Sequence, residues 1–339
     1  MSAATPIIEL QGVSKRFGKT LDLAARAARG LATAMGRPPR NDVIRAVDGV
    51  SLAVQSGEVL GLVGESGCGK STIGRMVAGI MPPSDGRVLY RGRDVAELPA
   101  AEARAAKLAV QMIFQDPFAS LNPRLRVEDI IGEAPLTHGL VARADWPLYV
   151  DEQLSRVGLD PSFKRRYPHQ FSGGQRQRLG IARALAVKPE FLVCDEAVAA
   201  LDVSIQAQIL NLFMDLREQL DLTYLFISHD LGVVEHLSDR VAIMYLGRIV
   251  EQADTEEIFG RPNHPYTQAL LSEVPRIDAR KKTFAAITGE IPSPLNPPPG
   301  CHFHPRCPHA MPRCAEQVPP LREIAPGHIA ACHLNDGPG

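Results

Sequence analysis

The stretch from Val59 to Thr72, which reads VLGLVGESGCGKST, constrains this chain more than any other. Gly64, Gly69, Lys70 and Ser71 match the pattern G-x-x-x-x-G-K-[ST], which is typical of a phosphate-binding P-loop. The apolar run before the glycines predicts a buried parallel strand, and the change of period after Ser71 predicts a helix. The apolar face of this helix is expected at Ile73, Met76, Val77 and Ile80.

A strand, a glycine-rich turn and a helix in this order form a site for phosphate groups. Glycines let the backbone wrap an anion without a Cβ clash, and the helix N-terminus offers free N–H groups to it. Lys70 would reach the β- and γ-phosphates of a nucleotide, and the Ser71 hydroxyl would bind magnesium. The residues expected to hold the phosphates are Gly64, Glu65, Ser66, Gly67, Cys68, Gly69, Lys70, Ser71 and Thr72.

Composition narrows the class of protein further. A chain of 339 residues suggests about two domains. Its 37 Lys and Arg residues balance 38 Asp and Glu residues, which argues against a nucleic-acid partner because such proteins usually carry a basic excess. No apolar run approaches the roughly 18 residues of a membrane span, and the N-terminal sequence lacks the features of a secretory signal. We therefore expect a cytosolic protein, in which six cysteines indicate metal or cofactor ligands before disulfides.

The segment before the P-loop supplies further strands. Weak alternation over residues 7–17 predicts an edge strand, and Phe17 at its end either stacks on a nucleotide base or packs on the core. Residues 18–44 are rich in Ala and Arg. They indicate a solvated surface helix or a flexible insertion, with contact to a membrane surface or a partner as the alternative. Regular strands resume over residues 44–54.

The segment after the P-loop adds another candidate site residue. Residues 110–114 predict a buried strand that ends at Gln115. A glutamine at a strand end beside a P-loop can bind the magnesium ion or the attacking water. Residues 116–170 mix Pro, Gly and helical patches, and predict an inserted, mostly helical subdomain.

A second helix terminus in this chain is suited to an anion. Residues 171–185 read FSGGQRQRLGIARAL, in which Ser172 and Gln175 form a capping-box start. Gly173 and Gly174 in the first turn cost helix stability, which suggests that the backbone there approaches something closely. The helix dipole and the uncovered N–H groups favour an anion, and an ordinary capped helix is the alternative.

Two carboxylates, Asp195 and Glu196, follow an apolar run at residues 191–193. A buried parallel strand that ends in two acids is the Walker B arrangement, in which the first acid holds magnesium and the second orients or deprotonates a water. The following residues predict a helix over 203–220 and a buried strand over 224–228. His229 ends that strand and is a candidate contact for the γ-phosphate.

The C-terminal part changes in character. Residues 240–252 predict a hairpin, and residues 254–274 predict a helix broken by prolines. Ten of the 28 prolines lie between residues 291 and 320, so no long helix or central strand is expected there. Four cysteines, with 5, 6 and 17 residues between them, lie in this tail: Cys301, Cys307, Cys314 and Cys332. Four thiolates can hold zinc or an iron–sulfur cluster, and nearby histidines leave a mixed Cys/His zinc site open.

Together these motifs resemble the ATP-binding cassette (ABC) ATPases. The resemblance rests on GESGCGKST, Gln115, FSGGQ, CDE and His229 in this order. FSGGQ makes it specific, because P-loop kinases and GTPases lack this sequence. Five further stretches are similar to the nucleotide-binding subunits of dipeptide, oligopeptide and nickel importers: FQDPFASLNPR, RYPHQFSGGQRQR, ALDVSIQAQILNL, HPYTQALL and GCHFHPRCPHAMPRC. The resemblance covers nearly the whole chain.

The resemblance implies an α/β fold and a division of the chain. Residues 1–260 would form a P-loop NTPase cassette, with a RecA-like parallel sheet core, an antiparallel β subdomain and an inserted helical subdomain at about 116–186. Residues 261–339 would form a C-terminal extension of the oligopeptide-transporter type, which carries the four cysteines. For these cysteines the resemblance favours a structural [4Fe–4S] cluster over zinc.

The resemblance also implies roles for individual residues. ATP would lie between the P-loop of one subunit and Ser172, Gly173, Gly174 and Gln175 of another, in a head-to-tail dimer. Magnesium would be held by Ser71, Gln115 and Asp195. Glu196 would activate water, with Gln115 and His229 at the γ-phosphate. Asp202 resembles the aspartate of the loop that crosses the dimer interface. Two positions depart from the commoner pattern, since Ala197 replaces a proline and Ala199 replaces a serine.

The partners that the resemblance implies are two membrane-spanning permease subunits and a second identical or homologous ATP-binding subunit. An extracytoplasmic solute-binding protein would take part indirectly. The protein would lie at the cytoplasmic face of the membrane and couple ATP hydrolysis to the uptake of peptides or related small solutes. The alternative is a non-transport ABC ATPase that acts in DNA repair or translation.

Overall fold

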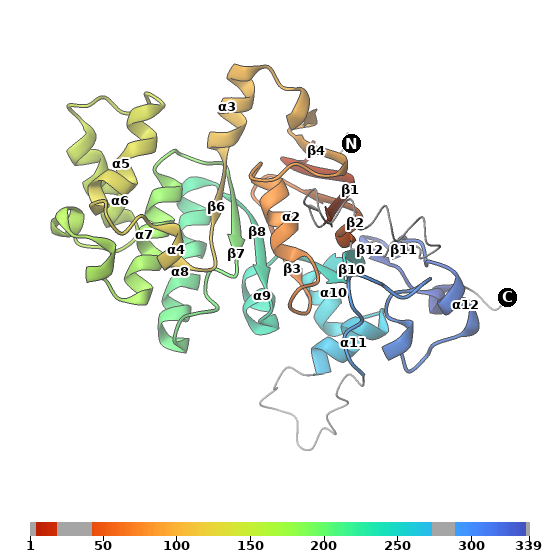
Figure 1. The fold of residues 1–339 in the computed structure, drawn as a ribbon. Helices are drawn as coiled ribbons and strands as arrows, with labels where there is room; N and C mark the ends of the chain where they lie inside the picture. Colours follow the sequence, from red (N-terminus) through yellow and green to blue (C-terminus); the bar gives the residue numbers. More distant parts are fainter. Residues whose placement is uncertain (1–4, 19–42, 273–288, 337–339) are drawn as a thin grey trace, which may run out of the picture.

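An eight-stranded sheet forms the centre of the protein, in the order β11-β12-β10-β9-β3-β8-β7-β6 (Figure 1). The computed structural model describes residues 5–18, 43–272 and 289–336, so the segment predicted as an insertion lies almost wholly outside the described residues. Five neighbouring strands run parallel: β6 (Val110–Ile113), β7 (Phe191–Asp195), β8 (Thr223–Ser228), β3 (Val59–Val63) and β9 (Arg240–Tyr245). Three antiparallel strands extend the sheet: β10 (Arg248–Asp254), β12 (His328–Ala330) and β11 (Arg322–Ala325).

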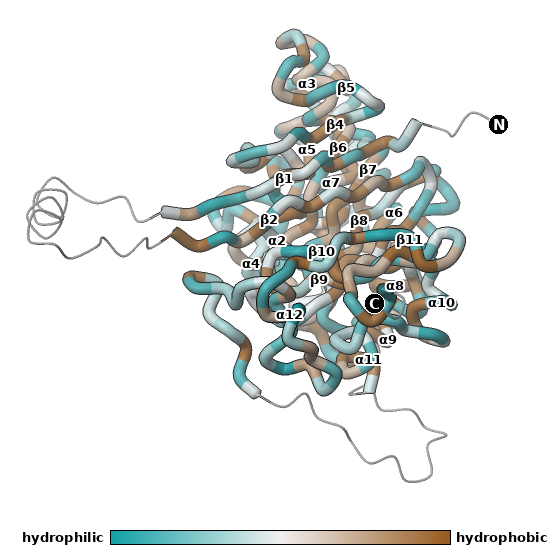
Figure 2. The backbone as a smooth tube through the Cα atoms, turned by 90° about the vertical axis from the view of Figure 1, so that its right-hand side faces the viewer, coloured by the Kyte–Doolittle hydropathy of each residue, from teal (hydrophilic) through white to brown (hydrophobic). Residues whose placement is uncertain are grey.

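The parallel strands are buried on both faces, which explains their nearly continuous apolar sequences. Figure 2 shows hydrophobic segments gathered among the strands at the centre and hydrophilic ones mostly toward the periphery. Because side chains alternate along a strand, Leu192 and Cys194 of β7 enter one core cluster, whereas Phe191 and Val193 enter the other. The predicted RecA-like parallel core is therefore present.

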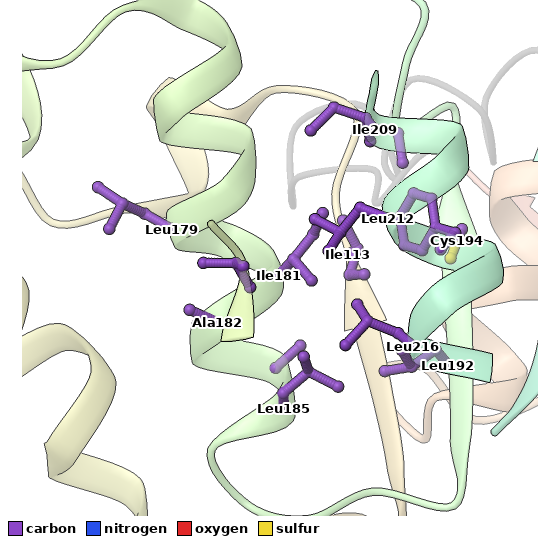
Figure 3. Close-up of a cluster of buried hydrophobic side chains, with 14 of the residues drawn as sticks. Ile113, Leu179, Ile181, Ala182, Leu185, Leu192, Cys194, Ile209, Leu212 and Leu216 are labelled. Carbon is purple, nitrogen blue, oxygen red and sulfur yellow. The ribbon is translucent and has the colours of Figure 1, made fainter. Parts of the chain in front are cut away.

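Helices cover one face of this sheet. They include α7 (Gly173–Leu185), α8 (Val203–Leu220) and α9 (Leu231–Leu237). Figure 3 shows Ile181 and Leu185 of α7 beside Leu212 and Leu216 of α8, and these side chains share one buried cluster with Ile113 of β6.

The other face carries helix α2 (Lys70–Val77) and a second, antiparallel sheet of order β2-β1-β4-β5. Its strands are β1 (Ile8–Gly18), β2 (Val43–Val54), β4 (Asp85–Tyr90) and β5 (Arg93–Asp94). The prediction of an edge strand at residues 7–17 is wrong, because β1 pairs with β2 on one side and β4 on the other. The weak alternation of β1 reflects register shifts along both pairings rather than a free edge.

Helix α2 ends earlier than its apolar period suggests. Gly79 takes a left-handed conformation with φ 66° just beyond the helix, as glycine commonly does after a helix C-terminus. Ile80 therefore does not join Ile73 on the buried face, and 53% of it is exposed. The predicted position of Ile80 in the core is wrong for this reason.

The inserted segment is helical, as predicted. It begins after η1 (Val95–Glu97), α3 (Ala100–Ala109) and β6, and precedes α7. Its helices are α4 (Pro117–Ser120), α5 (Val127–Thr137), α6 (Trp146–Arg156), η2 (Pro161–Arg165) and η3 (Pro168–Gln170).

The C-terminal part lies against the β9–β10 end of the sheet (Figure 1). Its elements are α10 (Thr255–Gly260), α11 (Pro265–Ser272), η4 (His304–Arg306), α12 (Pro312–Glu316), β11, β12 and η5 (His333–Asn335). As predicted, residues 291–320 contain only short helices among the described residues. Phe303 packs into a buried cluster with Tyr245 and Tyr266. The tail thus shares the cassette's core instead of forming its own.

Candidate nucleotide site

The P-loop connects β3 to α2 and is fixed from several directions. Lys70 is buried, and its Nζ donates to the carbonyl oxygens of Gly64 at 2.6 Å and Glu65 at 3.1 Å. The carbonyl oxygen of Cys68 accepts a hydrogen bond from the N–H of Gly247, at the β9–β10 turn. These hydrogen bonds hold the loop in a closed shape.

Two glycines of the loop are required by close backbone contacts. A Cβ on Gly64 would lie 2.1 Å from the Met244 carbonyl oxygen, and a Cβ on Gly69 would lie 2.1 Å from that of Ala46. Gly69 also has a φ of 112°, which other residues rarely adopt. The glycine pattern thus permits both the turn and its tight packing on the neighbouring strands.

A carboxylate lies next to the start of α2. The Ser71 hydroxyl, in the first turn of α2, donates to Oδ1 of Asp195, the last residue of β7, at 2.8 Å. Burial raises the pKa of Asp195, and the hydrogen bond from Ser71 partly opposes this shift. A serine hydroxyl and a carboxylate in contact are the oxygen ligands that Mg²⁺ prefers, so this pair fits the ion.

Three polar side chains meet at the ends of β6, β7 and β8. Gln115 Nε2 donates to Glu196 Oε2 at 2.7 Å, and His229 Nδ1 lies 3.4 Å from the same oxygen. Glu196 adopts a left-handed backbone with φ 48°, a strained conformation of the kind that is found at functional sites. The carboxyl ends of parallel strands thus bring together Gln115, Glu196 and His229 although they are far apart in sequence.

The start of α7 forms the predicted capping box. The Ser172 hydroxyl accepts from Gln175 N at 3.3 Å, and Gln175 Oε1 accepts from Ser172 N at 3.0 Å. In contrast to α2, which lies on the antiparallel-sheet face, α7 lies on the helical face of the central sheet (Figure 1). Ser172 and Gly173 are exposed, so this helix start is open to solvent.

Two other candidate residues lie on the surface. Phe17 is exposed at the end of β1, where Lys15 Nζ lies 5.7 Å from its ring centroid. Asp202 precedes α8, and its side chain makes no capping hydrogen bond to that helix. The next residue, Val203, is 83% exposed.

The structure reveals site contacts that no local sequence pattern indicates. The Tyr266 hydroxyl of α11 accepts a hydrogen bond from Glu65 N at 3.0 Å. Arg306 of the tail forms two hydrogen bonds with the Glu65 carboxylate, at 2.8 and 2.9 Å. These partners lie 201 and 241 residues from Glu65 in sequence, so no local motif indicates them.

The four tail cysteines line one small cavity of about 10 Å³. Burial raises the pKa of Cys301 and Cys307, and raises that of Cys332 to about 11. Within the described residues, however, no group of three or more His, Cys, Asp or Glu side chains is arranged to hold a metal ion. The predicted iron–sulfur or zinc centre is therefore not supported by the arrangement of these side chains.

The parallel sheet, the closed P-loop and the paired acids define a P-loop nucleotide hydrolase. The family profile described as ABC transporter matches residues 47–199, and the profile described as oligopeptide/dipeptide transporter, C-terminal region, matches residues 250–314. The oligopeptide transport ATP-binding protein AppF of Bacillus subtilis (strain 168) is 54% identical over 295 residues, which are 86% of this chain and 90% of that protein.

Solved structures agree with this result. CbiO1 from Clostridium perfringens, part of the ABC transporter complex CbiONQ, has a TM-score of 0.61 at 24% identity and covers 76% of this chain and 92% of its own. The ATP-binding cassette MJ0796, solved as a dimer in a post-hydrolysis state with ADP and Pi, has a TM-score of 0.60 at 25% identity and covers 73% and 98%. The chain belongs to the ABC transporter family, in its oligopeptide and dipeptide branch, and is an ATPase.

These similarities confirm the predicted fold class and family. They do not favour the alternative of a DNA-repair or translation ATPase. In the part of the chain that the structure describes, no helix is both long and apolar enough to cross a membrane.

Proposed function

We propose that this protein is the ATP-hydrolysing subunit of a membrane importer for peptides or related small solutes, and that ATP binds at its P-loop. Lys70 and the loop backbone would hold the phosphates, and Ser71, Asp195 and Gln115 would hold Mg²⁺, which supplies charge neutralisation at the phosphates. The observation that carries this proposal is the meeting of Ser71 with Asp195 and of Gln115 with Glu196. Phe17 would stack on the base.

Glu196 is proposed as the general base, and Gln115 and His229 position the γ-phosphate and the attacking water. Both of these side chains already lie against Glu196 Oε2. Glu196→Gln should retain ATP binding and lose turnover by about 10²–10⁴-fold, which is the usual contribution of a general base. The measurement is steady-state ATPase activity beside equilibrium nucleotide binding, and parent-level turnover in the variant would overturn the assignment. Asp215→Asn, which changes a carboxylate on α8 outside the site, is the control.

We further propose a head-to-tail dimer in which the α7 start of one subunit faces the ATP of the other. Two features of the surface support this geometry: the exposed, capped helix start at Ser172–Gln175 and the exposed Val203 beside Asp202. The Glu196→Gln protein should then form a dimer in the presence of ATP, which light scattering after size exclusion can detect. A variant that binds ATP and stays monomeric at every concentration tested would count against the dimer.

The proposed partners are two membrane-spanning subunits, with a solute-binding protein on the other side of the membrane, and the proposed location is the cytoplasmic face of the membrane. Phe118 and Leu148 of the helical subdomain are large exposed apolar side chains, as expected for a surface that another protein covers. Co-purification from solubilised membranes tests this proposal. Membrane subunits that are recovered with the parent and lost with Phe118→Asp would support the contact, while equal recovery would contradict it.

For the tail we propose a thiolate-bound metal centre at Cys301, Cys307, Cys314 and Cys332, with a [4Fe–4S] cluster as the first candidate and zinc as the second. The support is that four thiols line one cavity, and the side chains would have to move together to bind either group. Anaerobically purified protein should absorb broadly near about 400 nm if the cluster is present, and Cys301→Ser should lose this absorbance. Colourless protein with one zinc would select the second candidate, and protein without metal would overturn both.

A further inference from the structure

The ion pair between Arg306 and Glu65 joins the C-terminal tail to the P-loop. Both Nη atoms of Arg306 donate to the two carboxylate oxygens of Glu65, at 2.8 and 2.9 Å. The Arg306 side chain is 5% exposed and that of Glu65 is 20% exposed. A planar guanidinium that binds a carboxylate through two parallel hydrogen bonds fixes orientation as well as distance.

Glu65 is the residue through which this contact reaches the phosphate site. Its N–H donates to the Tyr266 hydroxyl, its carbonyl oxygen accepts from Lys70 Nζ, and its carboxylate is held by Arg306. The N–H of Cys68 also donates to the Glu65 carbonyl oxygen, at 3.3 Å. The backbone groups and the side chain of Glu65 are thus all engaged, and the carboxylate is held from outside the cassette.

Arg306 is supported by a packed cluster of aromatic rings. Its Nη1 also donates to the Tyr245 hydroxyl at 3.3 Å. Tyr245, Tyr266 and Phe303 pack against one another in tilted and edge-to-face arrangements, with ring centroids 4.6 to 5.4 Å apart. These rings come from β9, α11 and the tail, so the guanidinium is placed by a packed aromatic cluster rather than by a flexible loop.

We propose that Arg306 is a positioning residue for ATP binding: it holds Glu65, and thereby the first turn of the P-loop, in the shape that receives phosphate. This inference rests on the proposed ATP site at the P-loop. A pre-shaped loop does not have to be ordered when the nucleotide binds, which increases affinity. Because Arg306 contacts Glu65 and none of the residues proposed for water activation, its loss should act on affinity and leave the chemical step largely unchanged.

The test measures Kd for Mg-ATP and the kcat and KM of the ATPase on the full chain. Arg306→Met should raise Kd and KM about tenfold, within the range usual for coupled sites, with kcat changed by less than about twofold. Arg306→Lys should give an intermediate value, because an ammonium keeps the charge and loses the two-pronged geometry. The matched control is Arg313→Met in the same tail, where the arginine pairs with Asp336 at 3.1 Å and should leave Kd at the parent value.

A double-mutant cycle separates positioning from general support of the fold. If Arg306 acts through Glu65, Arg306→Met should have little effect on Kd in a Glu65→Gln background. An equal effect in both backgrounds would overturn the proposal, as would a folded Arg306→Met or Arg306→Lys protein with parent affinity. Where Arg306→Met fails to fold, Arg306→Lys and Glu65→Gln complete the cycle.

The Lys70→Ala variant distinguishes a failure of the positioning role from a failure of the proposed ATP site on which that role rests. Loss of ATP binding in Lys70→Ala together with parent affinity in the Arg306 variants would overturn only the positioning role. Parent affinity in Lys70→Ala would overturn the ATP site itself.

Discussion

At the scale of a single residue, the nucleotide site lowers the stability of the folded protein through Asp195. The side chain is buried, and burial raises the pKa of its carboxyl, so the folded protein disfavours the charged form. This cost is fully present at pH values above the raised pKa and disappears as the pH falls below the ordinary value of about 4. The bound Mg²⁺ would offset it.

We therefore predict that Asp195→Asn raises the thermal stability of the nucleotide-free protein at neutral pH. The gain should shrink toward pH 4, and the stabilisation by Mg-ATP should be lost because a metal ligand is gone. Thermal unfolding with and without Mg-ATP measures both effects. The exposed Asp202→Asn is the control and should show no such gain. A destabilised nucleotide-free variant would contradict this account of the burial cost.

Residues that belong to short motifs could be assigned from the sequence, and those that act through distant contacts could not. Lys70 and Ser71 follow from the P-loop pattern, and Asp195 follows from the apolar strand that it ends. Each of these patterns spans only a few residues. The structure then brings Ser71 and Asp195 together. Arg306 and Tyr266 form hydrogen bonds with Glu65, although they lie 241 and 201 residues from it in sequence. Nothing in their local sequence indicates this contact, because it depends on how the tail packs on β9.

At the scale of elements, the α7 start gives a sharp test of the dimer. Ser172→Arg places a large side chain at the exposed helix start, so it should block hydrolysis while each P-loop still binds nucleotide. Loss of the cap costs only about 1 kcal/mol, so the variant should fold. ATPase activity and nucleotide binding are compared, with the exposed Ser162→Arg as the control. A Ser172→Arg protein with parent ATPase activity would contradict the head-to-tail arrangement.

One buried side chain links strand β10 to the residues just before α11 and to β12. Glu251 accepts hydrogen bonds from the N–H groups of Asn263 at 2.7 Å and His264 at 2.9 Å, and its Oε1 lies 2.7 Å from His328 Nε2. Glu251→Ala would leave these groups unpaired in the interior, and we predict that it lowers the free energy of unfolding by about 3–5 kcal/mol. Urea titration measures this value. The exposed Glu256→Ala should change it by less than about 0.5 kcal/mol.

The periodicity of apolar residues predicted where helices and strands lie better than it predicted strand pairing and helix ends. Strands β3, β7 and β8 carry continuous apolar runs because both of their faces are covered, and this signal is local. The position of β1 inside its sheet depends on its pairing with β4, which follows the P-loop. No pattern within residues 7–17 indicates that pairing. The end of α2 depends on the left-handed backbone conformation of Gly79. The spacing of apolar residues does not predict this conformation.

At the scale of the whole molecule, the division into a cassette and an extension is visible in sequence but not in the packing. Proline content changes near residue 291, whereas strand β12 pairs with β10 and Phe303 lies in the core under β9. The tail is too poor in regular structure to bury a core of its own, so it completes that of the cassette. Composition therefore predicted where the chain changes character and could not predict that the two parts share a sheet and a buried cluster.

The pairing of β12 with β10 has a consequence for the solubility of shortened forms of the chain. Glu251 and Gln252 pair with Ala330 and Ile329, so a chain that ends after Ser272 would present the backbone of β10 as an open edge. Exposed strand edges template association between copies. We predict that the shortened chain aggregates, whereas the full chain remains dispersed, as measured by light scattering at equal concentration. A shortened chain that stays monomeric would show that pairing with β12 is not needed to prevent aggregation through β10. By this account, the tail keeps copies of the ATPase from joining through their sheets.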